Sequence, residues 1–455
     1  MSLDLLARKL RTFDYFTIGF GTMVGVGWLV VMDDWLGRGG YLGAILGFAI
    51  GGVALLPIAY VYGQLVARLP DAGGEIAYTA QVFPPKVSFA TGWMMMLGYL
   101  VVCPWEAVAI GKIAGYIFPW MNRLELYRVA GYPIYLPHLV AGIGLTIAIT
   151  WINYRGVQLS ARFQNWTTIG LLVLFLAFSS FGLAKGSVAN LAAPFAHSGL
   201  VSVLLMMQIV PYFMVGFESV AKCSEEARPD FATRNFFHAM AAAIVVGIVF
   251  YTAVIFVVAY IHPWRSLLGH SFATSIAFET AFGQRWVVRL IFLAAILSLL
   301  KVFNGNFLAA SRMLFALGRR NLIHPRFGKI HPVNQTPGPA ILTIGVASAA
   351  TAFFGQALLV PITEVGSMAS AFGWLAACAA YSRMDSRLVQ RAVATCGMAV
   401  AAVLVLIKLL PGVPGHFSPY EWMALTGWCV LGAMLGRQRP RNEPFVRNIK
   451  RQSTK

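Results

Sequence analysis

Long apolar runs, separated by short polar segments, follow one another along nearly the whole chain. A helix that crosses a bilayer needs about 20 mostly apolar residues, and twelve runs are close to this length or exceed it. We expect spans at residues 13–35, 41–66, 87–119, 134–153, 161–184, 199–222, 237–261, 286–317, 338–355, 359–381, 390–410 and 419–436. The pattern therefore predicts an all-α integral membrane protein with twelve transmembrane helices.

Two of these runs carry residues that interrupt a helix near its middle. The first run has four glycines between Gly19 and Gly27, and a glycine weakens a helix interior by about 1 kcal/mol relative to alanine. In the sixth run, Pro211 removes a backbone donor and Gly216 follows it. Glycine-rich spans also occur at close helix contacts, which is the alternative explanation for the first run alone.

The two interruptions fall in the first span of each of two five-span blocks. Paired interruptions at matching places are typical of transporters built from inverted repeats. We therefore expect five parts, namely a cytoplasmic N-terminus (1–12), a first repeat (13–184), a second repeat (199–381), two peripheral spans (390–436) and a basic cytoplasmic tail (437–455).

An interrupted helix exposes unpaired backbone groups inside the membrane. The N–H groups of one half-helix carry partial positive charge and suit a carboxylate, whereas the C=O groups of the other suit an ammonium or a cation. Such groups must bind something or face water at this depth. Two breaks side by side therefore predict a site for a zwitterion such as an amino acid.

Composition agrees with a membrane protein and gives the net charge a topological meaning. The chain of 455 residues is 58% hydrophobic and 11% charged, against roughly a quarter charged in soluble domains, and its mean hydropathy is +0.70. Of the 35 Lys and Arg residues behind the net charge of +18, 25 fall on the side of the two termini and 8 on the other.

Basic loops stay on the cytoplasmic side, so this asymmetry predicts a multi-pass protein of the cell (plasma or inner) membrane with both termini cytoplasmic. Because the charge is spread over several loops, it does not indicate a nucleic-acid partner. The basic tail either contacts anionic lipid or serves topology alone.

Motifs for other chemistries are missing from the sequence. The five cysteines are widely spaced, and the eight histidines form no metal-ligand pattern. No phosphate-binding loop, nucleophile elbow or dinucleotide fingerprint occurs. We expect no cofactor, no metal and no enzymatic activity.

Four segments carry a resemblance to a known family. They are the glycine-rich first run, the loop at 68–75 that reads Arg-Leu-Pro-Asp-Ala-Gly-Gly-Glu, the junction at 153–157 and the stretch at 216–226. Over about residues 10–340 the chain resembles the amino acid–polyamine–organocation (APC) permeases. The resemblance implies a LeuT-like 5+5 core with broken helices 1 and 6, plus two peripheral helices. It also implies exchange or proton-coupled symport, with substrate held between spans 1, 3, 6, 8 and 10.

The resemblance also implies roles for single residues. Gly25, Val26 and Gly27 match the segment that receives the substrate carboxylate, and Val215 and Gly216 match the segment near its amine. An aromatic gate is matched by Tyr212, and a glutamate implicated in proton coupling is matched by Glu218.

Two departures from the family pattern matter for coupling and for the pocket. A lysine common in span five is absent, with Gly170 or Leu171 near its place, which leaves the coupling ion open. Trp28 follows Gly27 where a smaller residue is usual. A bulky side chain there could reshape the pocket.

Ionisable residues at membrane depth are functional candidates, since each costs a few kcal/mol on insertion scales. Glu106 shares a helix face with Tyr99 and Cys103. It could bind a substrate cation, carry a proton, or form an internal ion pair with Lys301. Lys112 is closer to the outer end and fits a side chain that reaches to the interface.

Lys301 lies on a polar stripe with Ser298 and Asn304. The stripe is either a hydrogen-bonded seam between helices or the source of a fixed positive charge. That charge could replace the span-five lysine or pair with Glu106, Glu364 or a substrate carboxylate. Glu364 could also be an interface residue.

The predicted function is secondary active transport of an amino acid or related small amine by alternating access, as a proton-coupled symporter. An exchanger and a channel are the alternatives, and an intramembrane enzyme lacks a nucleophile–base pair. The expected substrate-binding residues are Thr22, Met23, Gly25, Val26, Gly27, Cys103, Glu106, Tyr212, Val215, Gly216, Asn304 and Glu364. The expected coupling or gating residues are Glu218, Lys301, Tyr212 and Trp28.

Overall fold

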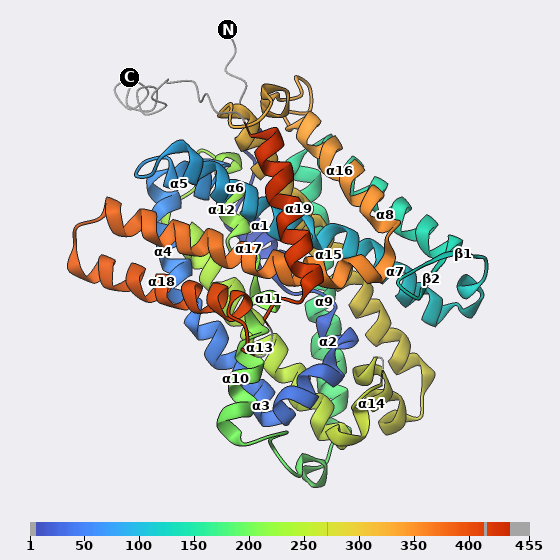
Figure 1. Ribbon diagram of the computed structural model, residues 1–455. Coiled ribbons are helices and arrows are strands. Elements are labelled where there is room, and N and C mark those ends of the chain that lie inside the picture. The colour runs from blue at the N-terminus through green and yellow to red at the C-terminus, as the bar shows by residue number, and fades with distance from the viewer. Residues whose placement is uncertain (1–5, 271, 414–415, 437–455) are drawn as a thin grey trace.

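The computed structural model describes residues 6–270, 272–413 and 416–436, and it is a bundle of helices (Figure 1). The side chains of residues 285 and 356–363 are outside this description. The predicted basic tail at 437–455 and the first five residues of the chain also lie outside it.

The helices follow the apolar runs closely. In chain order they are α1 Thr12–Met23, α2 Gly27–Val30, α3 Met32–Ala54, α4 Leu56–Arg68, α5 Glu75–Thr79, α6 Pro85–Leu100, α7 Val102–Ile117, α8 Leu136–Arg155, α9 Val157–Lys185, α10 Gly199–Met207, α11 Val210–Met214, α12 Ser219–Lys222, α13 Arg234–Ile261, α14 Ala273–Phe282, α15 Arg285–Arg319, α16 Gly338–Ala352, α17 Gly355–Met384, α18 Leu388–Leu409 and α19 Pro419–Leu435.

Among the described residues, eight helical stretches are long and apolar enough to cross a membrane. They are Thr12–Val30, Met32–Arg68, Pro85–Ile117, Leu136–Arg155, Val157–Lys185, Arg234–Ile261, Trp286–Arg319 and Leu388–Leu409. The other four predicted runs contain α10 to α12, α16, α17 and α19. The helical membrane architecture is thus confirmed, whereas twelve spans and an inverted repeat remain predictions.

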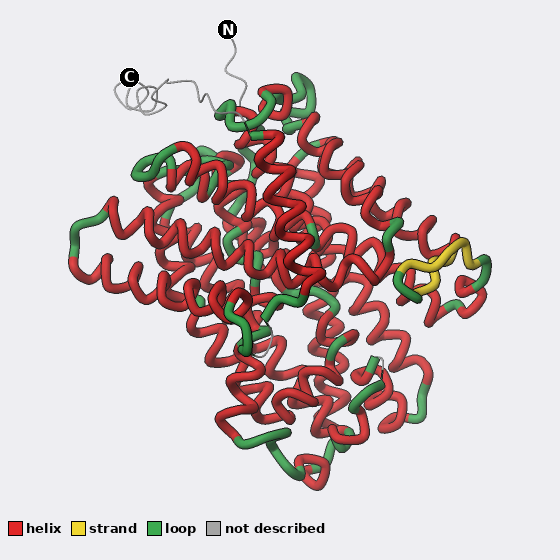
Figure 2. The backbone as a smooth tube through the Cα atoms, viewed as in Figure 1, coloured by secondary structure: helices red, strands yellow, loops and turns green. Residues whose placement is uncertain are grey.

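Two local features differ from the predicted elements. Strands β1 Glu125–Val129 and β2 Tyr132–Tyr135 form an antiparallel hairpin at the side of the bundle (Figure 2), so the all-α prediction is wrong for these nine residues. Ala130 and Gly131 both have positive φ, as the tightest hairpin turns require.

The second span also begins earlier than predicted. α3 starts at Met32 and turns at Gly40, whose φ is 61°. A side chain at Gly40 would come within 2.6 Å of the Pro194 carbonyl oxygen. The segment between α9 and α10, which contains Pro194, therefore comes so close that the bend requires glycine.

The long helix α15 lies inside the bundle and contacts α1, α6, α7, α9 and α16. Large apolar side chains are exposed on the outer faces of α8 and α9, including Trp151 and Trp166. Exposed apolar surface of this extent fits a lipid-facing exterior. The polar groups at membrane depth are consequently concentrated around α1 and α15.

Candidate substrate site between two broken helices

The first break lies between α1 and α2. Residues 24–26 are unwound, and Val24 is extended with φ −89° and ψ 100°, so the interruption expected from the glycine-rich sequence is present. The N–H groups of Val26 and Gly27 donate to no hydrogen bond within the described part of the chain. They are available to an anionic group.

Side chains of α15 hold the carbonyl side of this break. Ser298 Oγ donates to the Val24 and Gly25 carbonyls at 3.1 and 2.8 Å. Lys301 Nζ donates to the Val24 carbonyl and, at 3.5 Å, to the Gly21 carbonyl. Both side chains are buried. The orphan carbonyls of α1 are therefore satisfied from α15, while N–H groups at the start of α2 stay free.

The second break, residues 215–218, lies between α11 and α12. Val215 is extended, and Gly216 has φ +123°. A Cβ at Gly216 would lie 2.8 Å from the Thr22 backbone, so the two breaks approach each other closely here. Pro211 is at the start of α11 rather than in the break.

A cavity of about 330 Å³ lies between the two breaks. Nine of the predicted substrate-binding residues line it, namely Thr22, Met23, Gly25, Val26, Gly27, Glu106, Tyr212, Val215 and Glu364. Further along, it is lined by Asp34, Arg38 and Lys408, which the sequence assigns to the end of the bundle opposite the termini. Helices from both predicted repeats thus contribute to one cavity.

Two buried acceptor oxygens of the cavity wall have no hydrogen-bond donor among the described residues. They are Glu106 Oε2 and Asn306 Oδ1. A Cβ at Gly25 would lie 3.5 Å from Glu106 Oε1, so the carboxylate is beside the first break. Asn306 donates to the Thr22 carbonyl at 3.2 Å. Unsatisfied buried acceptors are expensive, and a ligand with N–H donors would satisfy them.

The structure narrows the possible ion-pair partners of the charged residues at membrane depth. Lys408 pairs with Glu364 at 2.5 Å, so Glu364 is not the partner of Lys301. No ion pair joins Glu106 to Lys301 in the described part of the chain, because the ammonium is turned toward the α1 carbonyls.

Three predicted binding residues and three predicted coupling or gating residues, Glu218, Lys301 and Trp28, do not line the cavity. The backbone of Gly216 packs on Thr22, Cys103 Sγ at the start of α7 donates to the Tyr99 carbonyl at the end of α6, and Trp28 stacks on Phe178 at 5.4 Å. Trp28 therefore fills space behind α2 and does not narrow the pocket.

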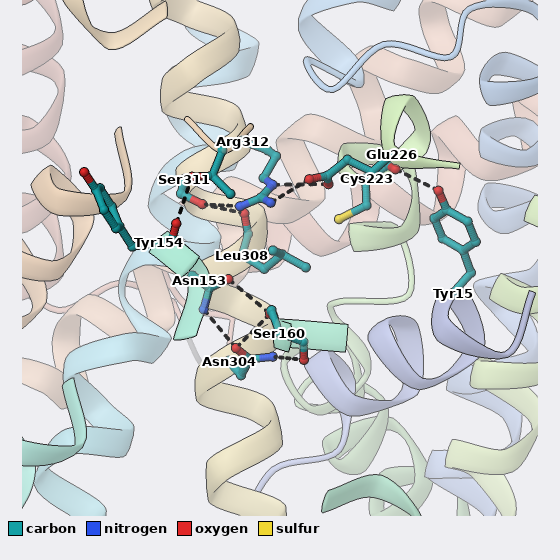
Figure 3. A network of polar contacts seen from close by, with 11 residues as sticks. Tyr15, Asn153, Tyr154, Ser160, Cys223, Glu226, Asn304, Leu308, Ser311 and Arg312 are labelled. Atoms are coloured by element: carbon teal, nitrogen blue, oxygen red, sulfur yellow. Dashed lines mark hydrogen bonds and ion pairs between the residues drawn. The ribbon is translucent and has the colours of Figure 1, made fainter. Parts of the chain in front are cut away.

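Asn304 is the third of these binding residues. Its amide donates to Gln164 at 2.8 Å. It accepts from Asn153 and Ser160 at 2.9 and 3.1 Å (Figure 3). This corresponds to the alternative of a polar seam between helices. A helix face can be predicted from spacing, but which neighbour it meets cannot.

Glu218 lies beyond the cavity, at the start of α12. Its carboxylate accepts from the Gly216 N–H at 3.0 Å and the Tyr99 hydroxyl at 3.1 Å. Lys222 donates to the Glu218 carbonyl at 3.3 Å and forms a fully buried ion pair with Glu75. The ion pair between Lys222 and Glu75 was not predicted from the sequence, although the Gly-Gly-Glu motif that ends at Glu75 was a signal for it.

Buried ion pairs close the end of the bundle beyond Glu218. Arg312 of α15 pairs with Glu226 at 2.7 Å, with both side chains fully buried (Figure 3). Burial raises the pKa of the Glu226 carboxyl, and Arg312 only partly offsets this. Arg320 and Arg319 pair with Asp71 at 2.8 and 3.3 Å.

Burial alone would raise the pKa of Asp71, but these two guanidinium groups outweigh it and lower that pKa. The N-terminal segment completes the closure. The N–H groups of Lys9 and Leu10 donate to the Glu226 carbonyl at 2.8 and 2.9 Å. The cavity and this closed end therefore lie on opposite sides of Glu218.

Known proteins were compared with the chain as a whole. A family model described as amino acid permease matches residues 10–435. The methylthioribose transporter of Bacillus subtilis is 26% identical over 381 residues, covering 80% of this chain and 79% of the relative. The branched-chain amino acid permease BcaP of the same species is 24% identical over 425 residues, covering 91% and 84%.

The gamma-aminobutyric acid permease of Bacillus subtilis is 28% identical over 341 residues, covering 71% of this chain and 68% of the relative. These relatives are transporters rather than enzymes. With a family match over nearly the whole length and a helical membrane fold, the chain belongs to the amino acid permeases of the APC superfamily.

Proposed function

We propose that this permease is a secondary active transporter that carries an amino acid or a related small amine by alternating access. The observation that carries the proposal is the single cavity lined by both helical breaks. One break offers the free N–H groups of Val26 and Gly27. The other offers the carbonyl of Val215, which accepts no hydrogen bond from the described residues.

These groups match the two ends of a zwitterion. The substrate carboxylate binds the N–H groups at the start of α2, where the helix dipole also favours negative charge. The ammonium binds near the Val215 carbonyl and Glu106. Glu106 supplies a negative charge in a low-dielectric cavity, where a charge-assisted hydrogen bond is strongest.

An amine-containing substrate fits this cavity better than an uncharged one. One relative is named for methylthioribose and two others for amino acids. An uncharged sugar would leave the Glu106 carboxylate buried without a counter-charge. The carboxylate therefore favours the amino acid class for this chain.

The surrounding architecture is proposed to have twelve spans in the plasma or inner membrane. Repeats at 13–184 and 199–381 would each contribute one broken helix, with both termini cytoplasmic. In that orientation the cavity opens outward, and the end with Glu226 and Arg312 is the closed cytoplasmic end. A cavity with one closed end supports a carrier over a channel.

Protons are proposed as the coupling ion. Glu218 is a buried carboxylate directly between the cavity and the closed end. Lys301 donates to α1 carbonyls that would otherwise suit a bound metal cation, so its ammonium would replace such an ion. Exchange of two amino acids is the alternative to symport.

The test combines binding with transport. Purified protein is screened by thermal shift against amino acids, amines and methylthioribose, and the hits are assayed for uptake into proteoliposomes. We expect an amino acid or amine to stabilise the protein and to accumulate when the vesicle interior is alkaline. Stabilisation by methylthioribose alone would refute the amine class, and uptake unaffected by the gradient would refute proton symport.

A further inference from the structure

A second pocket, of about 340 Å³, lies at the N-terminal end of α1. The segment before α1, the first turns of α9 and the loop after α12 form it. It gathers five basic side chains and one acidic one, namely Arg8, Lys9, Arg11, Arg162, Arg228 and Asp14. This concentration of positive charge is separate from the cavity between the broken helices.

The positive charge of this basic pocket is largely unneutralised. The carboxylate of Asp14 is already occupied, because it accepts from the Arg11 N–H and from Asn165, each at 2.7 Å. Arg228 pairs with Asp230 at 3.0 Å, whereas Lys9, Arg11 and Arg162 form no ion pair within the described ranges. Like charges held this close repel each other, and a bound anion would relieve the repulsion.

Exposed apolar side chains flank the basic pocket on both helices. Trp166 is 76% exposed and lies one turn from Arg162 on the same face of α9. Leu159, on the other side of Arg162, is 39% exposed, and Phe13 on α1 is 49% exposed. Aromatic and basic side chains side by side are typical of the membrane–water interface.

We propose that the basic pocket binds the phosphate headgroup of an anionic membrane lipid. The arginines supply planar donors that match phosphate oxygens, and the acyl chains would run along Trp166 and Leu159. A headgroup here would bridge the N-terminal segment, α9 and the loop that carries Arg228. Topology alone explains cytoplasmic basic residues, but not their convergence on one pocket beside exposed apolar side chains.

The test measures lipid binding, and it needs no transport substrate. The full chain in neutral detergent is titrated with phosphatidylglycerol, with phosphatidylcholine of the same acyl chains, and with glycerol phosphate, and bound lipid is counted by native mass spectrometry. The pocket variant carries Lys9→Gln, Arg11→Gln and Arg162→Gln. The matched control carries Lys86→Gln, Arg326→Gln and Lys329→Gln, which are exposed cations elsewhere.

We expect phosphatidylglycerol to bind the wild type and the control equally. The pocket variant should bind it roughly a hundredfold more weakly, since each cation near an anionic surface contributes about fivefold. Arg162→Gln alone should lose about fivefold, which guards against a folding defect in the triple variant. Equal binding by all variants, equal weakening in the control, or glycerol phosphate binding as tightly as the lipid would each overturn the proposal.

Discussion

The two central carboxylates differ in what surrounds them, and this separates their proposed roles. Glu106 faces the cavity, and one of its oxygens has no donor among the described residues. Glu218 is fully buried and hydrogen-bonded to Tyr99 and Gly216. We therefore assign substrate charge to Glu106 and proton movement to Glu218.

Replacing Glu106 by glutamine should weaken binding of an amine substrate. Glutamine keeps the size but removes the charge, and a hydrogen bond to a charged group contributes about 1.5–3 kcal/mol. We expect a Kd raised roughly 10- to 150-fold in a thermal-shift or calorimetric titration. Thr343→Ala, an exposed change on α16, is the control. Unchanged affinity would mean that the ammonium binds elsewhere.

Replacing Glu218 by glutamine should abolish proton-driven accumulation and leave the protein folded. Glutamine can still accept from the Gly216 N–H through its oxygen and can donate its amide N–H to the Tyr99 hydroxyl oxygen, but it cannot release a proton. Uptake driven by an inward proton gradient should fall to the level of empty vesicles, while Glu279→Gln, an exposed change on α14, should have no effect. Gradient-dependent uptake that persists in the Glu218 variant would exclude its coupling role.

Most of the predicted substrate-binding residues line the cavity, and those at the two breaks could be predicted because their sequence segments have a special backbone. Glycines near residue 25 and the break after Met214 mark unwound backbone whatever packs around it. Asn304 and Cys103 could not be assigned in this way. Spacing placed each on a helix face, but the face turned out to meet another helix or its own backbone.

At the scale of elements, the first break depends on α15 as much as on its own glycines. Ser298 and Lys301 bind carbonyls that lost their helical partners. The unwound segment is therefore a preorganised structure, held at one side and open to ligand at the other. The polar stripe predicted on α15, formed by Ser298, Lys301 and Asn304, hydrogen-bonds to the first break and to a neighbouring helix.

Removing the Ser298 hydroxyl should loosen this break. Ser298→Ala leaves the Gly25 carbonyl without a donor, while the Val24 carbonyl keeps Lys301, and a buried acceptor without a donor costs about 1–3 kcal/mol. We expect a lower Tm and weaker substrate binding together, because the N–H groups of α2 lose their fixed position. Ser180→Ala, an exposed change on α9, should change neither. A lower Tm with full affinity would show that the break is positioned independently of α15.

The elements themselves were largely predictable from hydrophobic length. The runs at 134–153 and 237–261, for example, correspond to α8 and α13 within a few residues. The hairpin was missed because β1 and β2 are short and follow a long apolar helix. The early start of α3 was missed because the bend at Gly40 depends on contact with Pro194, far along the chain.

At the scale of the molecule, the cavity and the closed end would open and close in turn during the proposed transport cycle. In the proposed alternating-access cycle, the Glu226–Arg312 pair and its neighbours would separate when the cavity closes. Sequence reasoning assigned these basic residues to topology, since nothing in a single sequence indicates that Arg312 and Glu226 are buried together. Their pairing depends on the packing of α15 against the loop after α12.

Breaking this pair on one side should destabilise the protein strongly. Arg312→Met leaves the Glu226 carboxylate buried without a cation, at a cost of about 3–5 kcal/mol. The double change with Glu226→Gln should be milder, because it removes both charges. Thermal denaturation of both variants measures the difference.

The loss in Arg312→Met should depend on pH. Burial already raises the pKa of Glu226, and without Arg312 it rises further. The folded variant therefore binds more protons than the unfolded chain, so its stability falls as pH rises from about 5 to 8. A pH-independent loss of stability, or a double variant as unstable as the single one, would show that an unpaired Glu226 carboxylate is not the cause of the loss.

Substrate is proposed to bind between the two breaks and to be carried across the membrane. A Cβ at Gly25 meets only ordinary contacts at 3.5 Å or more, so Gly25→Ala should be tolerated, whereas Gly25→Leu should fill the space beside Glu106 and Val302. Gly144 on α8 has open space around it, and Gly144→Leu is the control.

The decisive measurement is proteoliposome uptake of the amino acid or amine found by thermal shift. The wild type, Gly25→Ala and Gly144→Leu should accumulate the substrate, and Gly25→Leu should not. Uptake by Gly25→Leu with unchanged rate and affinity would show that the substrate does not bind between the two breaks.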